Sequence, residues 1–225
     1  LVGWDISGTF AKKLGTMRYL SYFISFFVHP IWIPIYGAMV FLSYIPVYLP
    51  MEEIRATWLS LLLGTVALPA LIYSVLFMVG WMNNPFIIVE KKGKWLLYGY
   101  IAVLLLVAFI VVPIEKYPIL YFYVMNLAIS CFLMVFLQYI RFYGNPFCMG
   151  IGALTCFAVL LSISHEIDMT YLVAGLLFAN GLCFSAQQYL TRQSAPNLLL
   201  SWLIGAVPQL SLIYLFRNMF ISLYL

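Results

Sequence analysis

Long apolar stretches alternate with short polar or proline-containing segments along the whole chain. About 20 apolar residues is the length that an α-helix needs to cross the hydrocarbon core of a bilayer. The pattern predicts seven such spans, over residues 19–48, 56–81, 95–112, 119–140, 147–162, 169–189 and 196–216. We therefore expect an all-α polytopic membrane helix bundle, with a short cytoplasmic N-terminal segment over residues 1–18 and a single transmembrane domain over residues 19–225.

Prolines interrupt the first two predicted spans. His29-Pro30 and Pro34 lie inside the first span, and Pro69 lies in the middle of the second. Proline lacks a backbone N–H, and its ring clashes with the preceding helical turn. We expect the first span to be kinked or to contain a re-entrant segment.

The composition agrees with a membrane protein and narrows the chemistry. Of the 225 residues, 65% are hydrophobic and only 8% are charged, which is more apolar surface than a soluble domain needs. The net charge of +4 is too small and too scattered to indicate a nucleic-acid partner. All four cysteines lie in apolar runs without metal or disulfide spacing, so we expect no metal or other cofactor. We also expect no cleavable signal peptide, because the first apolar run is too long.

The charged residues divide between two sides of the membrane. Seven spans place the termini on opposite sides, and the N-terminal side collects most of the cations, which are Lys12, Lys13, Arg18, Lys91, Lys92, Lys94, Arg141 and Arg192. The positive-inside rule places that side in the cytoplasm, although phosphate-binding cations would produce the same distribution. Three polar junctions, at residues 90–94, 141–145 and 185–197, then lie on one side.

The polar residues of these junctions are the candidate site, because each polar group at membrane depth needs a partner. The lysines either bind anionic lipid headgroups or simply flank a span. The glutamines either bind a ligand or bond to another helix, and Asn145 either belongs to the site or caps the fifth helix. The candidate residues for lipid-headgroup binding are Lys91, Lys92, Lys94, Arg141, Tyr143, Asn145, Gln187, Gln188, Arg192 and Gln193.

Several kinds of chemistry find no support in the sequence. No carboxylate lies in the middle of a span, as proton-coupled transporters and aspartate-based prenyl transferases require. The HExxH and GxSxG motifs are absent. His29 is either an acid or base, a ligand, or a hydrogen-bonding group for the backbone freed by the prolines. About ten residues of helix would place it about 15 Å deep, too deep to reach Lys91 or Arg192. His165, followed by Glu166 and Asp168, is expected in a solvated loop.

Four segments carry a resemblance to a known family. They are residues 27–37 (FVHPIWIPIYG), 89–94 (VEKKGK), 143–153 (YGNPFCMGIGA) and 185–197 (SAQQYLTRQSAPN). In order and spacing they resemble the motifs HP…PTYG, DRRER, KxSxHxxGIGG and SARxxLGxHTxxQ of small bacterial membrane proteins related to the type 2 phosphatidic acid phosphatases, the lipid phosphate phosphatases. The resemblance covers most of the chain, with few identities. It implies a lipid-phosphatase-like core in the bacterial inner membrane.

The departures from the family pattern decide what the resemblance implies. In that family one histidine attacks phosphorus, a second protonates the leaving alkoxide, and a lysine and an arginine hold the phosphate oxygens. The matching positions here are Phe147 and Gln193 for the histidines, Tyr143 for the lysine and Gln187 for the arginine. Loss of both halves of a nucleophile and acid pair removes the mechanism. The resemblance therefore implies a catalytically inactive relative.

The sequence thus favours a non-catalytic protein, either a lipid-binding protein or a structural subunit of a membrane assembly. Its expected partners are membrane lipids and other membrane-protein subunits. Two alternatives stay open. One is an active lipid phosphate phosphatase with a site rearranged around His29, and the other is a small lipid transporter or flippase with a polar path through Gln187 and Gln188. The degenerate site is either open to a headgroup or packed shut by Phe142, Tyr143 and Phe147.

Overall fold

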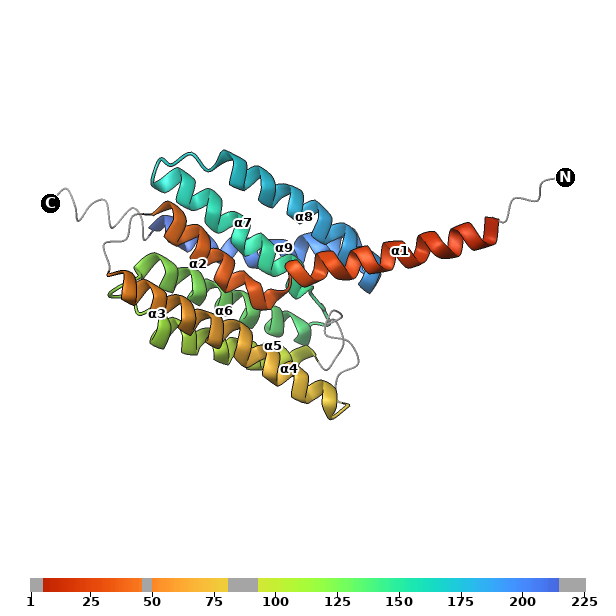
Figure 1. The fold of residues 1–225 in the computed structure, drawn as a ribbon, viewed down its shortest axis with the longest axis horizontal. Coiled ribbons are helices and arrows are strands. Elements are labelled where there is room, and N and C mark those ends of the chain that lie inside the picture. Colours follow the sequence, from red (N-terminus) through yellow and green to blue (C-terminus); the bar gives the residue numbers. More distant parts are fainter. Residues whose placement is uncertain (1–5, 46–49, 81–92, 215–225) are drawn as a thin grey trace.

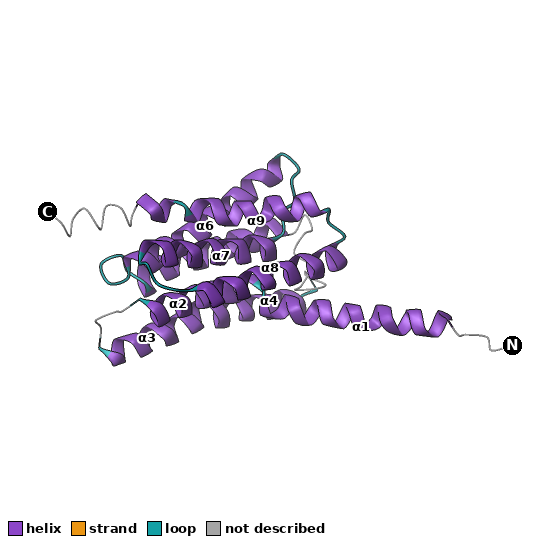
Figure 2. Cartoon of the chain, turned by 90° about the horizontal axis from the view of Figure 1, so that it is seen from above, coloured by secondary structure: helices purple, strands orange, loops and turns teal. Residues whose placement is uncertain are grey.

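The structure is a computed structural model, and it describes residues 6–45, 50–80 and 93–214. Within these ranges the regular structure is entirely helical (Figures 1 and 2). Six segments are long and apolar enough to cross a membrane, and Trp95–Val111 is a shorter apolar helix. The predicted polytopic all-α bundle is confirmed. The six long segments are Met17–Tyr44, Met51–Val75, Pro118–Tyr139, Pro146–Ser164, Thr170–Thr191 and Ala195–Tyr214.

The helices run back and forth along the bundle (Figure 1). The elements in chain order are α1 (Ile6–Phe27), η1 (Pro30–Trp32), α2 (Ile33–Tyr44), α3 (Met51–Leu61), η2 (Leu62–Ala67), α4 (Leu68–Met78), α5 (Gly93–Leu106), η3 (Val107–Val111), α6 (Pro118–Tyr139), α7 (Pro146–Ser164), α8 (Thr170–Thr191) and α9 (Ala195–Gln209). Here η1 is a 3₁₀ turn, and η2 and η3 are π-helical.

The first span is broken at His29 and Pro30, as the prolines predict. α1 ends at Phe27, and the chain turns through η1 before α2 begins at Ile33. His29 is the N-cap of η1, and its Nδ1 accepts a hydrogen bond of 3.3 Å from the backbone N–H of Ile31. α1 projects beyond the other helices (Figure 1). The residues that precede His29 therefore do not carry it deep into the bundle.

The second span changes its helical form before Pro69. The N–H of Leu68 bonds to the carbonyl of Leu63, five residues earlier, at the end of the π-helical segment η2. Pro69 has no N–H to offer the preceding turn, which removes one α-helical hydrogen bond. The Thr65 hydroxyl also bonds back to the Leu61 carbonyl, at 2.8 Å. The widened turn is thus explained by local sequence, and such π segments are frequent at functional sites.

α7 is the central helix of the C-terminal half, and most of its residues are buried. It packs closely against α9 because glycines remove side chains from the contact. A Cβ at Gly205 would collide with the Met149 carbonyl oxygen, and a Cβ at Gly152 would collide with the Trp202 carbonyl oxygen. Small residues of this kind let membrane helices approach to backbone contact.

The back-and-forth path gathers two polar junctions at one end of the bundle, which we call the junction end: residues 140–145, between α6 and α7, and residues 192–194, between α8 and α9 (Figure 1). The start of α5 lies at the same end. The opposite end holds a surface ion pair between Lys116 Nζ and Glu53 Oε2, at 3.0 Å. Two of the three junctions thus lie at one end, as the number of spans between them predicts, whereas residues 90–92 of the third lie outside the described residues.

Candidate functional site

Three amide side chains meet at the junction end, and we call them the amide cluster: Asn145, Gln187 and Gln193. The Asn145 Nδ2 group donates to Gln187 Oε1 at 3.0 Å and to Gln193 Oε1 at 3.1 Å. These residues are 42 and 48 positions apart from Asn145 in the chain. Two of the three sequence junctions therefore form one structural unit.

Asn145 is the hub of the amide cluster. It precedes Pro146 as the N-cap of α7, and its Oδ1 accepts from the N–H groups of Phe147 and Cys148. Its own N–H donates to the Ser201 hydroxyl of α9 at 2.8 Å. The side chain is 0% exposed, and both amide hydrogens and the carbonyl oxygen are engaged. The expected capping role is confirmed, and Asn145 also joins helices.

The two glutamines extend the amide cluster to other elements. Gln187 Nε2 donates to the Ser25 hydroxyl of α1 at 2.8 Å, and Gln187 is 1% exposed. Gln193 Nε2 donates to the Tyr143 carbonyl at 2.8 Å. The amide cluster therefore ties α1, the α6–α7 connection, α7, α8 and the α8–α9 connection together. Its members are neutral, so it offers no group that takes up or releases a proton near neutral pH.

The other predicted site residues lie around the amide cluster. Gln188 is exposed while its neighbour Gln187 is buried, so the two do not form one polar path. Arg141 and Arg192 are exposed, and both have left-handed backbone angles, with φ of 66° and 54°. Tyr143 is partly buried and contributes its backbone carbonyl rather than its hydroxyl to the amide cluster.

The three lysines belong to the segment before α5 and to its first turn. Lys91 and Lys92 lie outside the described residues, and Lys94 lies in the first turn of α5. Of the ten candidate residues, the structure brings together Asn145, Gln187, Gln193 and the backbone of Tyr143.

Asn145 and Gln187 of the amide cluster are buried, and Gln193 is partly buried. Phe147 directly follows Pro146 in α7 and is 1% exposed. Its ring lies 5.2 Å from the His29 ring, edge to face. The prediction that His29 lies too deep to reach Lys91 or Arg192 stays a prediction, since Lys91 lies outside the described residues. His29 is 6% exposed, and a second aromatic ring, that of Tyr73, lies 5.8 Å away.

The acidic loop at residues 164–168 lies at the other end of α7 and carries no metal-binding arrangement. No group of three His, Cys, Asp or Glu side chains within the described residues could hold a metal ion. Asp168 Oδ1 accepts from the Thr170 N–H at 3.0 Å, and the hydrogen bonds from the Thr170 side chain and backbone lower the pKa of Asp168. Burial lowers the pKa of His165, against an opposing hydrogen bond to the Leu161 backbone.

Sequence reasoning missed two further polar clusters that join helices. Asn180 Nδ2 donates to the Thr155 hydroxyl at 2.8 Å, and Trp202 Nε1 donates to Asn180 Oδ1 at 2.7 Å. Asn126 Nδ2 donates to the Ser211 hydroxyl at 3.0 Å. A single asparagine in an apolar run is the only signal that the sequence offers for such contacts, and it does not name the partner.

No family model, curated protein or solved structure matches this chain. The chemical reading of the site therefore comes from its own geometry. Buried amides that satisfy one another can hold helices in register, and interhelical hydrogen bonds of this kind contribute about 0.6 kcal/mol each on average. Exposed cations beside them remain free to meet lipid headgroups.

Proposed function

We propose that this chain is a non-catalytic integral membrane protein whose junction end binds anionic lipid headgroups. The observation that carries the proposal is the amide cluster, in which neutral side chains bury their hydrogen-bonding groups against one another. Arg141 and Arg192 lie exposed beside this cluster. In this proposal the amide cluster is a scaffold, and the two arginines form the lipid-binding face.

The absence of catalysis is supported by the chemistry of the side chains in place. An amide cannot act as a general acid or form a phosphoenzyme near neutral pH, and the Phe147 ring can do neither. Asn145 has both amide hydrogens committed to Gln187 and Gln193. A phosphate group would have to break these bonds to be bound by the amide cluster, and the broken bonds would offset the new ones.

The binding of headgroups is supported by the position of the two arginines. Each follows a membrane-spanning helix, α6 for Arg141 and α8 for Arg192, and so lies at the level where lipid headgroups begin. A cation at an anionic membrane surface contributes about 1 kcal/mol. Arginine also matches the geometry of a phosphate group with two parallel N–H donors.

The test is lipid retention by the purified full chain. Protein in detergent is mixed with phosphatidylglycerol or phosphatidylcholine, and bound lipid is counted by native mass spectrometry. We expect preferential retention of phosphatidylglycerol, and a loss of at least tenfold in that preference in the Arg141→Gln/Arg192→Gln double variant. Arg55→Gln, at the opposite end and also exposed, is the control. Equal preference in the double variant and the wild type would contradict the headgroup proposal.

If the purified protein retains no lipid but brings down a second membrane protein at fixed stoichiometry, the structural-subunit form of the proposal is supported instead. The amide cluster would then serve to hold the bundle in a shape that fits the partner. Gel filtration of protein from native membranes, followed by mass spectrometry of the complex, distinguishes this outcome from headgroup binding.

One observation favours a second candidate function, a lipid phosphate phosphatase rebuilt around His29. The His29 ring contacts Phe147, the position that matches the family's nucleophilic histidine. Phosphate release from phosphatidate, phosphatidylglycerol phosphate and undecaprenyl pyrophosphate tests it. The His29→Asn variant is the sharp control, because asparagine keeps a capping acceptor for Ile31 and removes the imidazole. Turnover in the wild type that is lost in His29→Asn would establish this candidate and sink the non-catalytic proposal.

A further inference from the structure

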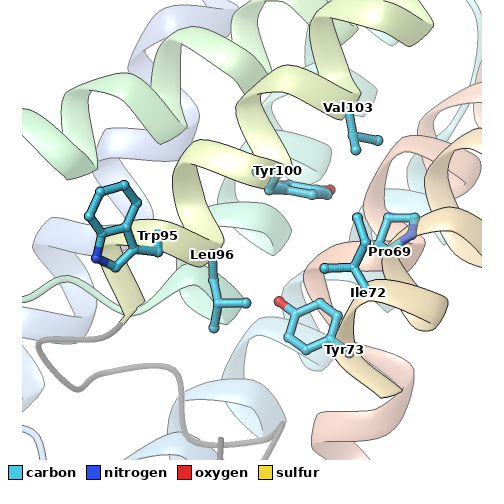
Figure 3. A pocket seen from close by; sticks show the side chains of 8 residues that line it. Pro69, Ile72, Tyr73, Trp95, Leu96, Tyr100 and Val103 are labelled. Carbon is cyan, nitrogen blue, oxygen red and sulfur yellow. The ribbon is translucent and has the colours of Figure 1, made fainter. Parts of the chain in front are cut away.

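A cavity of about 320 Å³ lies between α4 and α5. Figure 3 shows its lining side chains, which come from α4 and α5. We call it the α4–α5 cavity. The lining residues that matter here are Pro69, Ile72 and Tyr73 from α4, and Trp95, Gly99 and Tyr100 from α5.

Local features of both helices account for the cavity. The two helices come close where η2 faces η3, and an added Cβ at Gly64 would lie 3.1 Å from Val107. Towards the junction end the cavity opens, past Pro69. Gly99 contributes no side chain there, and a Cβ at that position would meet nothing within 4 Å. The space is thus built into the sequence at Gly99 and Pro69.

The walls of the cavity are apolar and aromatic, with tyrosine hydroxyls as the polar groups. The Tyr100 hydroxyl already has a partner inside the protein, because it donates a hydrogen bond to the Pro30 carbonyl at 2.6 Å. The Tyr73 hydroxyl points towards Leu96 (Figure 3), and it has no hydrogen-bond partner among the residues that the structure describes. An apolar space with one available donor is typical of a ligand pocket.

We propose that the α4–α5 cavity holds one hydrocarbon chain of an anionic membrane lipid, with the Tyr73 hydroxyl available to an ester carbonyl of that lipid. The inference rests on the proposed lipid-binding function and deepens it, because it places the chain as well as the headgroup. Both walls belong to apolar helices, and the surroundings of such helices in a membrane are hydrocarbon. A lipid chain is therefore the molecule that surrounds the cavity in a membrane.

The size of the cavity separates a lipid chain from a helix of a partner or of a second copy. From Trp95 to Val103 the lining extends over nine residues of α5, or about 12 Å from the first to the last. A helix segment of that length, with a diameter of about 10 Å, occupies about 900 Å³. The cavity has about 320 Å³, so a helix would enter it with a side chain only, whereas a single hydrocarbon chain fits along it.

The sequence around the mouth of the cavity favours an anionic lipid. Lys94 directly precedes Trp95, and Trp95 is 68% exposed at the start of α5. Tryptophan is enriched at the level of the headgroups, and lysine near the end of a span attracts anionic lipid. A lipid chain that enters the cavity at Trp95 would thus enter next to a lysine of the sequence.

The test uses the full chain in nanodiscs of phosphatidylcholine and phosphatidylglycerol, the latter with a diazirine in one acyl chain. After irradiation, cross-linked peptides are identified by mass spectrometry. We expect labelling concentrated on residues 69–73 and 95–103. The Gly99→Phe variant fills the cavity and should lower this labelling at least fivefold. Gly175→Phe, at an exposed α8 glycine where a Cβ also meets nothing within 4 Å, should leave it unchanged.

Two further variants keep the test decisive. Gly99→Val is a smaller substitution for use if Gly99→Phe does not yield monodisperse protein, and it should lower labelling about twofold. Tyr73→Phe keeps the ring and removes the hydroxyl, and it should lower labelling by about twofold to tenfold if that group binds the ester. Labelling spread evenly over all lipid-facing helices, or unchanged in the Gly99 variants, would overturn the cavity inference, as would cross-links between two copies through this seam.

The outcomes separate this inference from the proposed function. If labelling misses the cavity while phosphatidylglycerol retention still depends on Arg141 and Arg192, the cavity inference fails and headgroup binding stands. If the cavity is labelled while retention ignores the arginines, the cavity is established as a chain site and the headgroup proposal fails. The two measurements use the same purified protein.

Discussion

Two spans of the bundle, α7 in one half and the α3–α4 span in the other, are apolar to a similar degree but are packed very differently. In α7, 72% of the most apolar stretch is buried inside the structure, whereas in the span formed by α3, η2 and α4 the share is 17%. The half that contains α7 has the amide cluster and the Asn180 hydrogen bonds. It also has Gly152 and Gly205, which lie against the backbone of the neighbouring helix. The α3–α5 half has two π-helical segments and a cavity.

An apolar surface alone does not hold one helix tightly against another in a membrane. Lipid tails are as apolar as leucine, so helix association depends on close packing and interhelical hydrogen bonds. α7 has both, through Gly152 at α9 and Asn145 at the α8–α9 connection. The lipid-facing span of α3 and α4 has a surface ion pair and a hydroxyl contact, Thr57 to Tyr117 at 3.1 Å. This looser half is where a lipid chain has room to enter.

The largest expected effect is a contrast between two glycines replaced by the same residue. Gly205→Leu drives a side chain into the Met149 carbonyl. It should lower the free energy of unfolding by more than the value typical of overpacking, which is about 1–3 kcal/mol. Gly99→Leu enters open space and should change the free energy of unfolding by less than about 0.5 kcal/mol. Thermal unfolding in detergent compares the two variants. Similar unfolding temperatures of the two variants would show that the two halves do not differ in packing.

The second effect concerns the amide cluster. Asn145→Ala removes the cap of α7 and two hydrogen bonds to other elements, and should lower the free energy of unfolding by about 2–4 kcal/mol. The matched control is Asn197→Ala, at an exposed asparagine of α9, which should cost less than about 0.5 kcal/mol. Reversible unfolding in mixed micelles measures both. Equal losses would mean that the amide cluster does not stabilise this half.

The third effect compares two tryptophans. Trp202→Phe removes the hydrogen bond to Asn180 and should cost about 0.6 kcal/mol, and at most about 1.7 kcal/mol. Trp95→Phe, in the looser half and 68% exposed, should be neutral. The same micelle titration resolves the pair. A costlier Trp95 variant would show that the α4–α5 cavity depends on its aromatic mouth for stability.

The smallest expected effect is a pH dependence at the far end of α7. The pKa of His165 is lowered in the folded state, so the unfolded state binds more protons below the ordinary value of 6.5. Stability should therefore fall as pH drops from 6.5 through the folded pKa, and His165→Gln should remove this slope. Asp168, whose pKa is also lowered, contributes stability that is lost only as the pH falls below its ordinary pKa of 3.8. An unchanged slope between pH 7 and 5 in His165→Gln would refute the assignment.

The candidate site was predicted in part, and Asn145 shows where prediction reaches. The motif Asn145-Pro146 at the start of an apolar run indicates a helix cap, because asparagine accepts from the first free N–H groups. The contact with Gln187 and Gln193 was not predictable, because those residues are separated from Asn145 by α7 and α8. His29 shows where prediction stops. Its position was counted along a continuous helix, whereas α1 ends at Phe27 and the chain turns at Pro30, so only the structure gives its contact with Phe147.

The sequence by itself determined the all-helical membrane class, the approximate bounds of the spans, the break at Pro30 and the gathering of two polar junctions at one end. These follow from hydrophobic length, proline chemistry and the alternation of antiparallel spans, all of which are local or counted along the chain. The tertiary structure alone decided that the amides close on one another, that Phe147 lies against His29, and that a cavity opens at Gly99. These depend on which face each helix turns to its neighbours, and an apolar pattern surrounded by lipid does not specify that face.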